Sequence, residues 1–194
     1  MVGEADGRWH PGIGDPTLGG WITVIAYFGT ALLAYRALRF HSRNLGSKSA
    51  STNAQALVGF WLLITGALVL LGINKQLDLQ SWFTEVGRDL ARAQGWYEGR
   101  RSVQALFVAA LVFLGLIGTT VLFVLLRPLI RQVGDALFGL GFLVIFVAVR
   151  AASFHHVDQL LRSGVIRLNW VLELGGIALI ALSAWRQGWD SSRS

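Results

Sequence analysis

The chain has 194 residues, of which 54% are hydrophobic and 14% charged, and it contains no cysteine. Soluble domains carry roughly a quarter charged residues, so a soluble globular protein is excluded, and so are disulfides, thiolate metal sites and cysteine nucleophiles. The net charge of +6 comes from Lys and Arg that flank apolar runs, which favours anionic lipid headgroups over nucleic acid as the charged partner.

Several apolar runs reach the roughly 20 residues that a helix needs to cross a bilayer core. They predict an all-α, polytopic integral membrane protein. Pro128 is expected to end the third helix, and the fourth is expected to continue to Leu161. Five transmembrane helices are predicted, at about Gly20–Leu38, Ala54–Ile73, Val103–Leu126, Val133–Phe154 and Val165–Trp185.

The long segment Lys75–Arg101 separates the second and third runs, and its apolar residues recur at helical spacing. This pattern predicts an amphipathic helix in the membrane interface at about 80–95, although a helix packed on the bundle has the same pattern. The predicted organisation is an extracytoplasmic segment 1–19, a five-helix membrane domain 20–186 and a tail 187–194. No cleavable signal peptide is expected, because no basic region precedes an apolar one at the start.

The basic residues around the first run predict the orientation. Arg8 precedes this run, and four basic residues follow it: Arg36, Arg39, Arg43 and Lys48. The positive-inside rule then places the N-terminus outside and the C-terminus in the cytoplasm. We expect an integral protein of the plasma (inner) membrane.

Ionisable residues follow the fourth apolar run in the stretch SFHHVDQLL. His155 and Asp158 share a helix face by their spacing. A tight turn makes the fourth and fifth helices antiparallel, so Glu173 is expected level with His155, and Asn169 level with Asp158. A carboxylate inside a span usually faces the bundle interior and is a functional candidate. The structural alternative is that Glu173 pairs with His155 or Arg150 and joins helices.

A second polar stretch, GINKQLDLQ, leaves the second helix on the same side of the membrane. Lys75 and Asp78 have the spacing of an i,i+3 pair, which suits general acid–base chemistry or anion binding. Helix termination with a lysine extended toward the interface is the structural alternative.

A divalent metal such as zinc is a candidate cofactor, with His155, Asp158 and Glu173 as ligands. No diagnostic spacing such as HExxH accompanies these residues. The glycines of LGGWITVIAYFGT, GLIG and FGLG are interpreted as packing positions that let helices approach closely.

Three functions fit this pattern. The first is a membrane-embedded enzyme acting on a lipid or apolar small molecule at the outer interface, with catalytic His155, Asp158, Glu173, Lys75 and Asp78. The second is a non-catalytic subunit, bound to a membrane-protein partner or to further copies of itself. The third, a small proton-linked transporter using Glu173, is disfavoured because the inner half of the spans is nearly devoid of polar groups.

Overall fold

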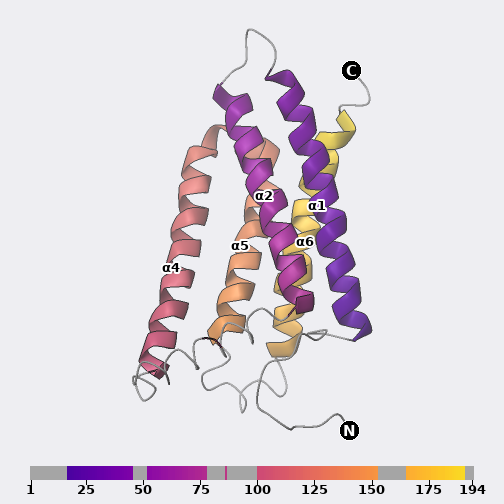
Figure 1. Cartoon of the computed structure of the whole chain (residues 1–194). Helices are drawn as coiled ribbons and strands as arrows, with labels where there is room; N and C mark the ends of the chain where they lie inside the picture. The colour runs from indigo at the N-terminus through magenta and orange to yellow at the C-terminus, as the bar shows by residue number, and fades with distance from the viewer. Residues whose placement is uncertain (1–16, 46–51, 78–85, 87–99, 153–164, 191–194) are drawn as a thin grey trace.

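The computed structural model describes residues 17–45, 52–77, 86, 100–152 and 165–190. Regular structure in these ranges is helical (Figure 1). A short 3₁₀ turn, η2 (Arg127–Leu129), joins the third and fourth of the long helices. The long helices are α1 (Leu18–Asn44), α2 (Thr52–Leu77), α4 (Arg100–Leu125), α5 (Ile130–Ala152) and α6 (Val165–Asp190).

Three helical segments are long and apolar enough to cross a membrane: Leu18–Arg43, Thr52–Leu77 and Arg127–Arg150. The protein is therefore all-helical with three candidate spans among the described residues. The predicted third and fifth helices are present as α4 and α6, but neither is among these three candidates. Within the described residues, the apolar part of α4 is the shorter Val112–Leu125. The predicted interfacial helix lies outside the described residues except for Val86, as does the continuation of the fourth helix to Leu161.

Local signals in the sequence set the helix ends. Thr17 caps α1, because its hydroxyl oxygen accepts a hydrogen bond of 3.1 Å from the Gly20 backbone N–H, which a helix start otherwise leaves unpaired. Pro128 stands at the start of η2, directly after α4. A proline suits the first position of a helix because it lacks the backbone donor that would have no partner there. The predicted end of the third helix is thus confirmed.

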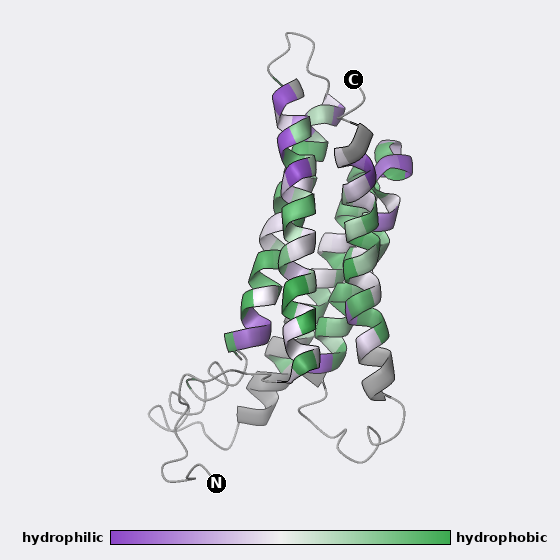
Figure 2. Cartoon of the chain, turned by 90° about the vertical axis from the view of Figure 1, so that its right-hand side faces the viewer, coloured by the Kyte–Doolittle hydropathy of each residue, from purple (hydrophilic) through white to green (hydrophobic). Residues whose placement is uncertain are grey.

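The helices run alternately up and down, which gives the bundle two ends (Figure 1). We call the end that carries Lys75, Arg150 and Glu173 the site end; it is the lower end in Figure 1. The other end, which carries His41 and Gln187, is the far end. Figure 2 shows hydrophobic residues along the middle of the helices and hydrophilic ones toward both ends, as expected for helices that cross an apolar layer.

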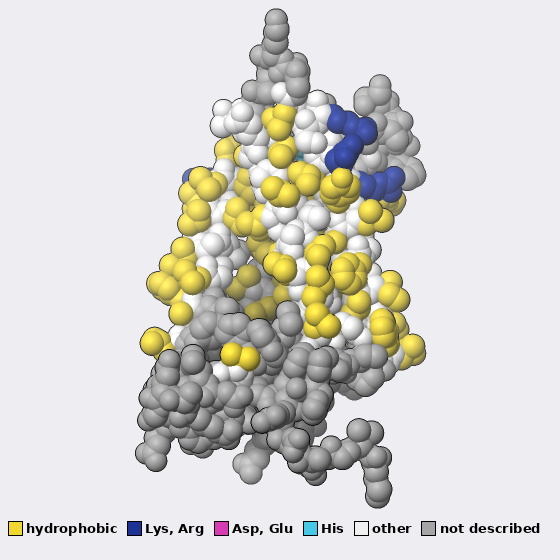
Figure 3. All heavy atoms as spheres, in the orientation of Figure 1, with side chains coloured by type: hydrophobic (Ala, Val, Ile, Leu, Met, Phe, Trp, Pro, Cys, Tyr) yellow, Lys and Arg dark blue, Asp and Glu magenta, His cyan; other side chains and the backbone are white. Residues whose placement is uncertain are grey.

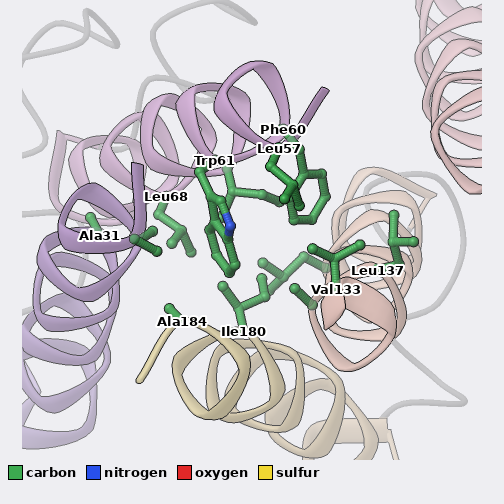
Figure 4. Close-up of a cluster of buried hydrophobic side chains, with 14 of the residues drawn as sticks. Ala31, Leu57, Phe60, Trp61, Leu68, Val133, Leu137, Ile180 and Ala184 are labelled. Carbon is green, nitrogen blue, oxygen red and sulfur yellow. The ribbon is translucent and has the colours of Figure 1, made fainter. Parts of the chain in front are cut away.

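The core lies between α1, α2, α5 and α6 (Figure 4). Trp61 of α2 extends into the centre of this core and is fully buried there. Around it lie Leu68 of α2, Val133 of α5 and Ile180 of α6. The α1 helix packs along α2 and α6, α5 packs along α6, and α4 packs on α5 at the edge of the bundle. The four inner helices therefore form the framework that positions polar side chains.

Glycines let α5 and α6 cross closely. A Cβ added at Gly139 would lie 2.6 Å from the Gly176 carbonyl oxygen, and one added at Gly176 would lie 2.8 Å from the Gly139 oxygen. The packing interpretation of FGLG is confirmed at Gly139 but not at Gly141, which faces open space. In GLIG it holds for Gly115, whose Cβ would lie 3.0 Å from Val144, but Gly118 faces open space.

The outer helix α4 exposes an apolar surface. In a membrane, such a surface contacts lipid tails or another helix. The space-filling view shows many hydrophobic side chains spread along the described part of this face (Figure 3). On α4 the exposed large residues are Leu106, Phe113, Leu114, Leu116, Ile117, Val121, Phe123, Val124 and Leu125.

Candidate functional site

A buried ion pair joins α2 to α6 at the site end. The Lys75 ammonium nitrogen lies 3.1 Å from Glu173 Oε2 and 3.2 Å from Oε1, so it donates to both carboxylate oxygens. The Glu173 side chain is 5% exposed and the Lys75 side chain 13%. The prediction that Glu173 faces the bundle interior is confirmed by this burial. Hydrogen bonds between charged groups of this kind are roughly twice as strong as neutral ones.

A tyrosine from a third helix completes the cluster. The Tyr27 hydroxyl donates to Glu173 Oε1 at 3.2 Å, and its side chain is buried on α1. Gly72 on α2 allows this arrangement, because a Cβ there would lie 3.1 Å from the Tyr27 Cβ and 3.3 Å from the Phe28 ring. We call Tyr27, Lys75 and Glu173 the carboxylate cluster. It joins α1, α2 and α6 through one carboxylate.

The charges around the carboxylate cluster do not balance among the described residues. Arg150, the third residue from the end of α5, is exposed at the same end of the bundle. Two cations, Lys75 and Arg150, thus accompany one described carboxylate. Burying an ion pair costs several kcal/mol of solvation per ion, which good geometry and further hydrogen bonds only partly offset. The arrangement is therefore weak as a source of stability alone and strong as a candidate for function.

The structure brings together two of the five predicted catalytic residues, Lys75 and Glu173. The other three, Asp78, His155 and Asp158, lie outside the described residues, as does the side chain of Asn169. However, α2 and α5 end, and α6 begins, at the site end (Figure 1). The described helices that adjoin these three residues in the chain therefore have their ends on the side of the carboxylate cluster.

Two features of the site were not anticipated from the sequence. Lys75 pairs with Glu173, whereas Asp78 was the expected partner. Tyr27 was not singled out, although a hydroxyl at the eighth residue of the predicted span Gly20–Leu38 needs a hydrogen-bond acceptor when it is buried. That requirement is the signal that could have identified it.

The predicted metal site remains a prediction. Among the described residues no group of three His, Asp or Glu side chains could hold a metal ion. Of the three proposed ligands, only Glu173 is described, and both of its oxygens already accept from Lys75. A metal cation bound there would have to compete with an ammonium group at the same oxygens.

A second polar cluster lies at the far end. The Gln187 amide oxygen accepts from the Trp61 indole N–H at 3.0 Å and lies 2.7 Å from His41 Nε2, while its nitrogen donates to the Gln132 carbonyl at 2.8 Å. Since an amide oxygen cannot donate, His41 Nε2 must carry the proton. We call His41, Trp61, Gln132 and Gln187 the amide cluster. His41, Gln132 and Gln187 lie just beyond the ends of the predicted spans, so the expectation that the inner half of the spans is nearly devoid of polar groups stays a prediction.

Both clusters take side chains from α1, α2 and α6, and the amide cluster adds the Gln132 backbone carbonyl of α5. Fourteen residues separate Tyr27 from His41, Trp61 from Lys75, and Glu173 from Gln187, which is about 21 Å along a helix. Buried apolar side chains fill the layer between them: Ala31, Ala34, Ile64, Leu68, Ile177 and Ile180.

Comparisons of the chain with protein-family models, curated proteins and solved structures found no match. The functional assignment therefore depends on the geometry of the two clusters.

Proposed function

We propose that the protein is a five-span membrane enzyme that acts on a lipid or apolar small molecule at the outer membrane interface. The observation that carries this proposal is the carboxylate cluster: a buried Glu173 held by a lysine and a tyrosine from two other helices. Ionisable groups inside membrane helices are costly and mark functional sites by default. His155, Asp158 and Asp78 are proposed as further catalytic groups on the same side.

The chemistry proposed for the cluster is acid–base catalysis. Glu173 would accept a proton from the substrate or from water, while Lys75, the more exposed of the pair, would stabilise negative charge that develops on a substrate oxygen. Tyr27 donates to Glu173 Oε1 and would hold the carboxylate in position. These three roles depend on the hydrogen bonds that Lys75 and Tyr27 donate to the Glu173 carboxylate.

Arginines at the far end support the proposed orientation. Arg36, Arg39 and Arg43 recur on one exposed face of α1, and Arg127, Arg131 and Arg186 lie toward the same end. Figure 3 shows Lys and Arg side chains near this end of an otherwise largely hydrophobic surface. By the positive-inside rule the far end would face the cytoplasm, where anionic lipid headgroups would contact the arginines. The site end would then face outward, in the plasma membrane.

A non-catalytic subunit is the second candidate function. It is favoured by one observation: both Glu173 oxygens are already hydrogen-bonded within the protein, as expected of a contact that only joins helices. The outward apolar face of α4 would then bind a partner helix or a second copy. A proton-linked transporter is disfavoured, because the apolar layer separates the two clusters by about four helical turns.

The test compares the lipids of membranes that contain wild-type protein, Glu173→Gln or Asp135→Asn. Asp135 is the matched control, since it forms an ion pair with Arg186 at 2.7 Å on the surface. Lipid extracts are compared by mass spectrometry after equal expression is verified. The enzyme proposal expects one lipid class to change with wild type and Asp135→Asn but not with Glu173→Gln. Identical extracts from all three, matching cells without the protein, would favour the subunit.

A further inference from the structure

Gln76, next to Lys75 at the end of α2, has a buried amide without a partner among the described residues. Its Oε1 and Nε2 each expose less than 1 Å², and neither makes a hydrogen bond in the part of the chain that the structure describes. It is the only residue with such buried, unpaired side-chain atoms among those described. Buried polar side-chain atoms nearly always have a partner, so each exception requires an explanation.

The helix geometry places Gln76 beside the carboxylate cluster. Gln76 follows Gly72 by four residues, so both lie on the same face of α2. At Gly72 that face packs against Tyr27 and Phe28 of α1. Gln76 is thus one turn closer to the membrane interface than the Tyr27 contact, and its neighbour Lys75 reaches Glu173.

The Gln187 amide at the far end shows what a structural role looks like. Gln187 is hydrogen-bonded at both ends of its amide: its oxygen contacts Trp61 and His41, and its nitrogen donates to the Gln132 backbone carbonyl. Gln76 has no such bonds among the described residues, although its amide is more deeply buried than that of the partly exposed Gln187. A buried amide that is left unpaired lowers stability, so a purely structural position would be better occupied by an apolar residue of the same shape.

We infer that the Gln76 amide binds the polar end of a lipid-like ligand at the carboxylate cluster, through a neutral group that both donates and accepts hydrogen bonds. This inference rests on the proposed function and specifies its ligand class. A primary amide offers two donors and one acceptor, which a hydroxyl or a second amide complements. An ester offers acceptors only, so it can accept from the Gln76 N–H groups but leaves the Gln76 oxygen without a donor.

The first experiment needs no ligand. The thermal midpoints of detergent-purified wild type, Gln76→Met and Gln187→Met are compared. The midpoint of Gln76→Met should equal or exceed that of wild type, because methionine removes an unpaired amide and keeps the volume. Gln187→Met should fall by several degrees, because it leaves Trp61 and His41 without their acceptor. A comparable fall for Gln76→Met would overturn the inference and assign Gln76 a structural partner.

The second experiment uses three probes with the same oleoyl chain: monoolein with hydroxyls, oleamide with an amide, and methyl oleate with an ester. Monoolein, oleamide or both should raise the wild-type midpoint by about 2–4 °C more than methyl oleate, and the probe that does so distinguishes a hydroxyl from an amide ligand. This difference should vanish in Gln76→Met. Equal shifts for all three probes, or a difference that survives in Gln76→Met, would contradict the inference. Neither readout depends on catalysis, so failure of the enzyme proposal would be recognised separately.

Discussion

Lys75 and Glu173 connect α2 and α6 through one ammonium group that donates to both carboxylate oxygens, at 3.1 and 3.2 Å. Tyr27 from α1 donates to the same carboxylate. Fourteen residues along each of these helices, the amide cluster joins them again. The three helices are thus connected by polar contacts at two levels, with an apolar layer between.

The buried pair predicts a large asymmetry between single and double variants. Lys75→Met and Glu173→Leu should each lower the free energy of unfolding by about 3–5 kcal/mol, because each leaves one uncompensated buried charge. The double variant should cost much less than the sum of the two. Reversible thermal or denaturant unfolding in detergent measures this. The surface pair Asp135–Arg186 is the control, and its coupling energy in the same double-mutant cycle should be about 0–1 kcal/mol. An equally small coupling energy for Lys75 and Glu173 would show that this pair is not buried.

Tyr27→Phe removes one hydrogen bond to a charged acceptor and retains the ring. We expect a loss of about 1.5–3 kcal/mol, the usual value for a bond of this kind. Tyr35→Phe is the matched control, since the Tyr35 hydroxyl contacts Arg39 on the surface of the same helix. Equal midpoints for the two variants would show that the Tyr27 hydroxyl does not hold the carboxylate.

The close crossing of α5 and α6 predicts that Gly176→Ala destabilises the bundle. The added Cβ would lie 2.8 Å from a backbone oxygen and 3.0 Å from Leu143, and overpacking of this kind costs about 1–3 kcal/mol. Gly118→Ala should be tolerated, because its Cβ meets open space and alanine favours a helix over glycine. A thermal midpoint for each variant checks the contrast, which a tolerated Gly176→Ala would contradict.

The proposed orientation can be tested by labelling single cysteines, because the chain has no cysteine of its own. Leu77 is exposed at the site end. In intact cells, Leu77→Cys should react with a membrane-impermeant maleimide that reaches the outer surface of the membrane. Arg43→Cys, exposed at the far end, should react only after the cells are opened. The reverse pattern would invert the proposed topology and place the carboxylate cluster on the cytoplasmic side.

Much of the helical framework could be predicted from the apolar runs, which the bilayer requirement converts into helices. The helices extend beyond those runs at several ends: α2 begins at Thr52 and ends at Leu77, and α6 continues to Asp190. Apolar runs identify the part of a helix that needs an apolar environment, whereas polar turns at each end contribute no such signal.

The site was less predictable because its contacts join distant segments. The inward position of Glu173 follows from the cost of a carboxylate in a span, but its partner depends on which helices become neighbours. Lys75 reaches it only because α1 packs along both α2 and α6. The Trp61–Gln187 contact depends on the same neighbours, and no spacing within either segment indicates it.

The central claim is that Lys75 and Glu173 carry out chemistry as well as joining helices, and exchanging the two charges tests it most directly. The double variant Lys75→Glu/Glu173→Lys keeps an ion pair between α2 and α6 but moves each group to the other helix. We predict that it recovers most of the thermal stability lost in the single variants, while its membranes keep the lipid composition of cells without the protein. A charge-exchanged protein that is stable and changes the lipids as wild type does would contradict the claim and leave the pair a structural link.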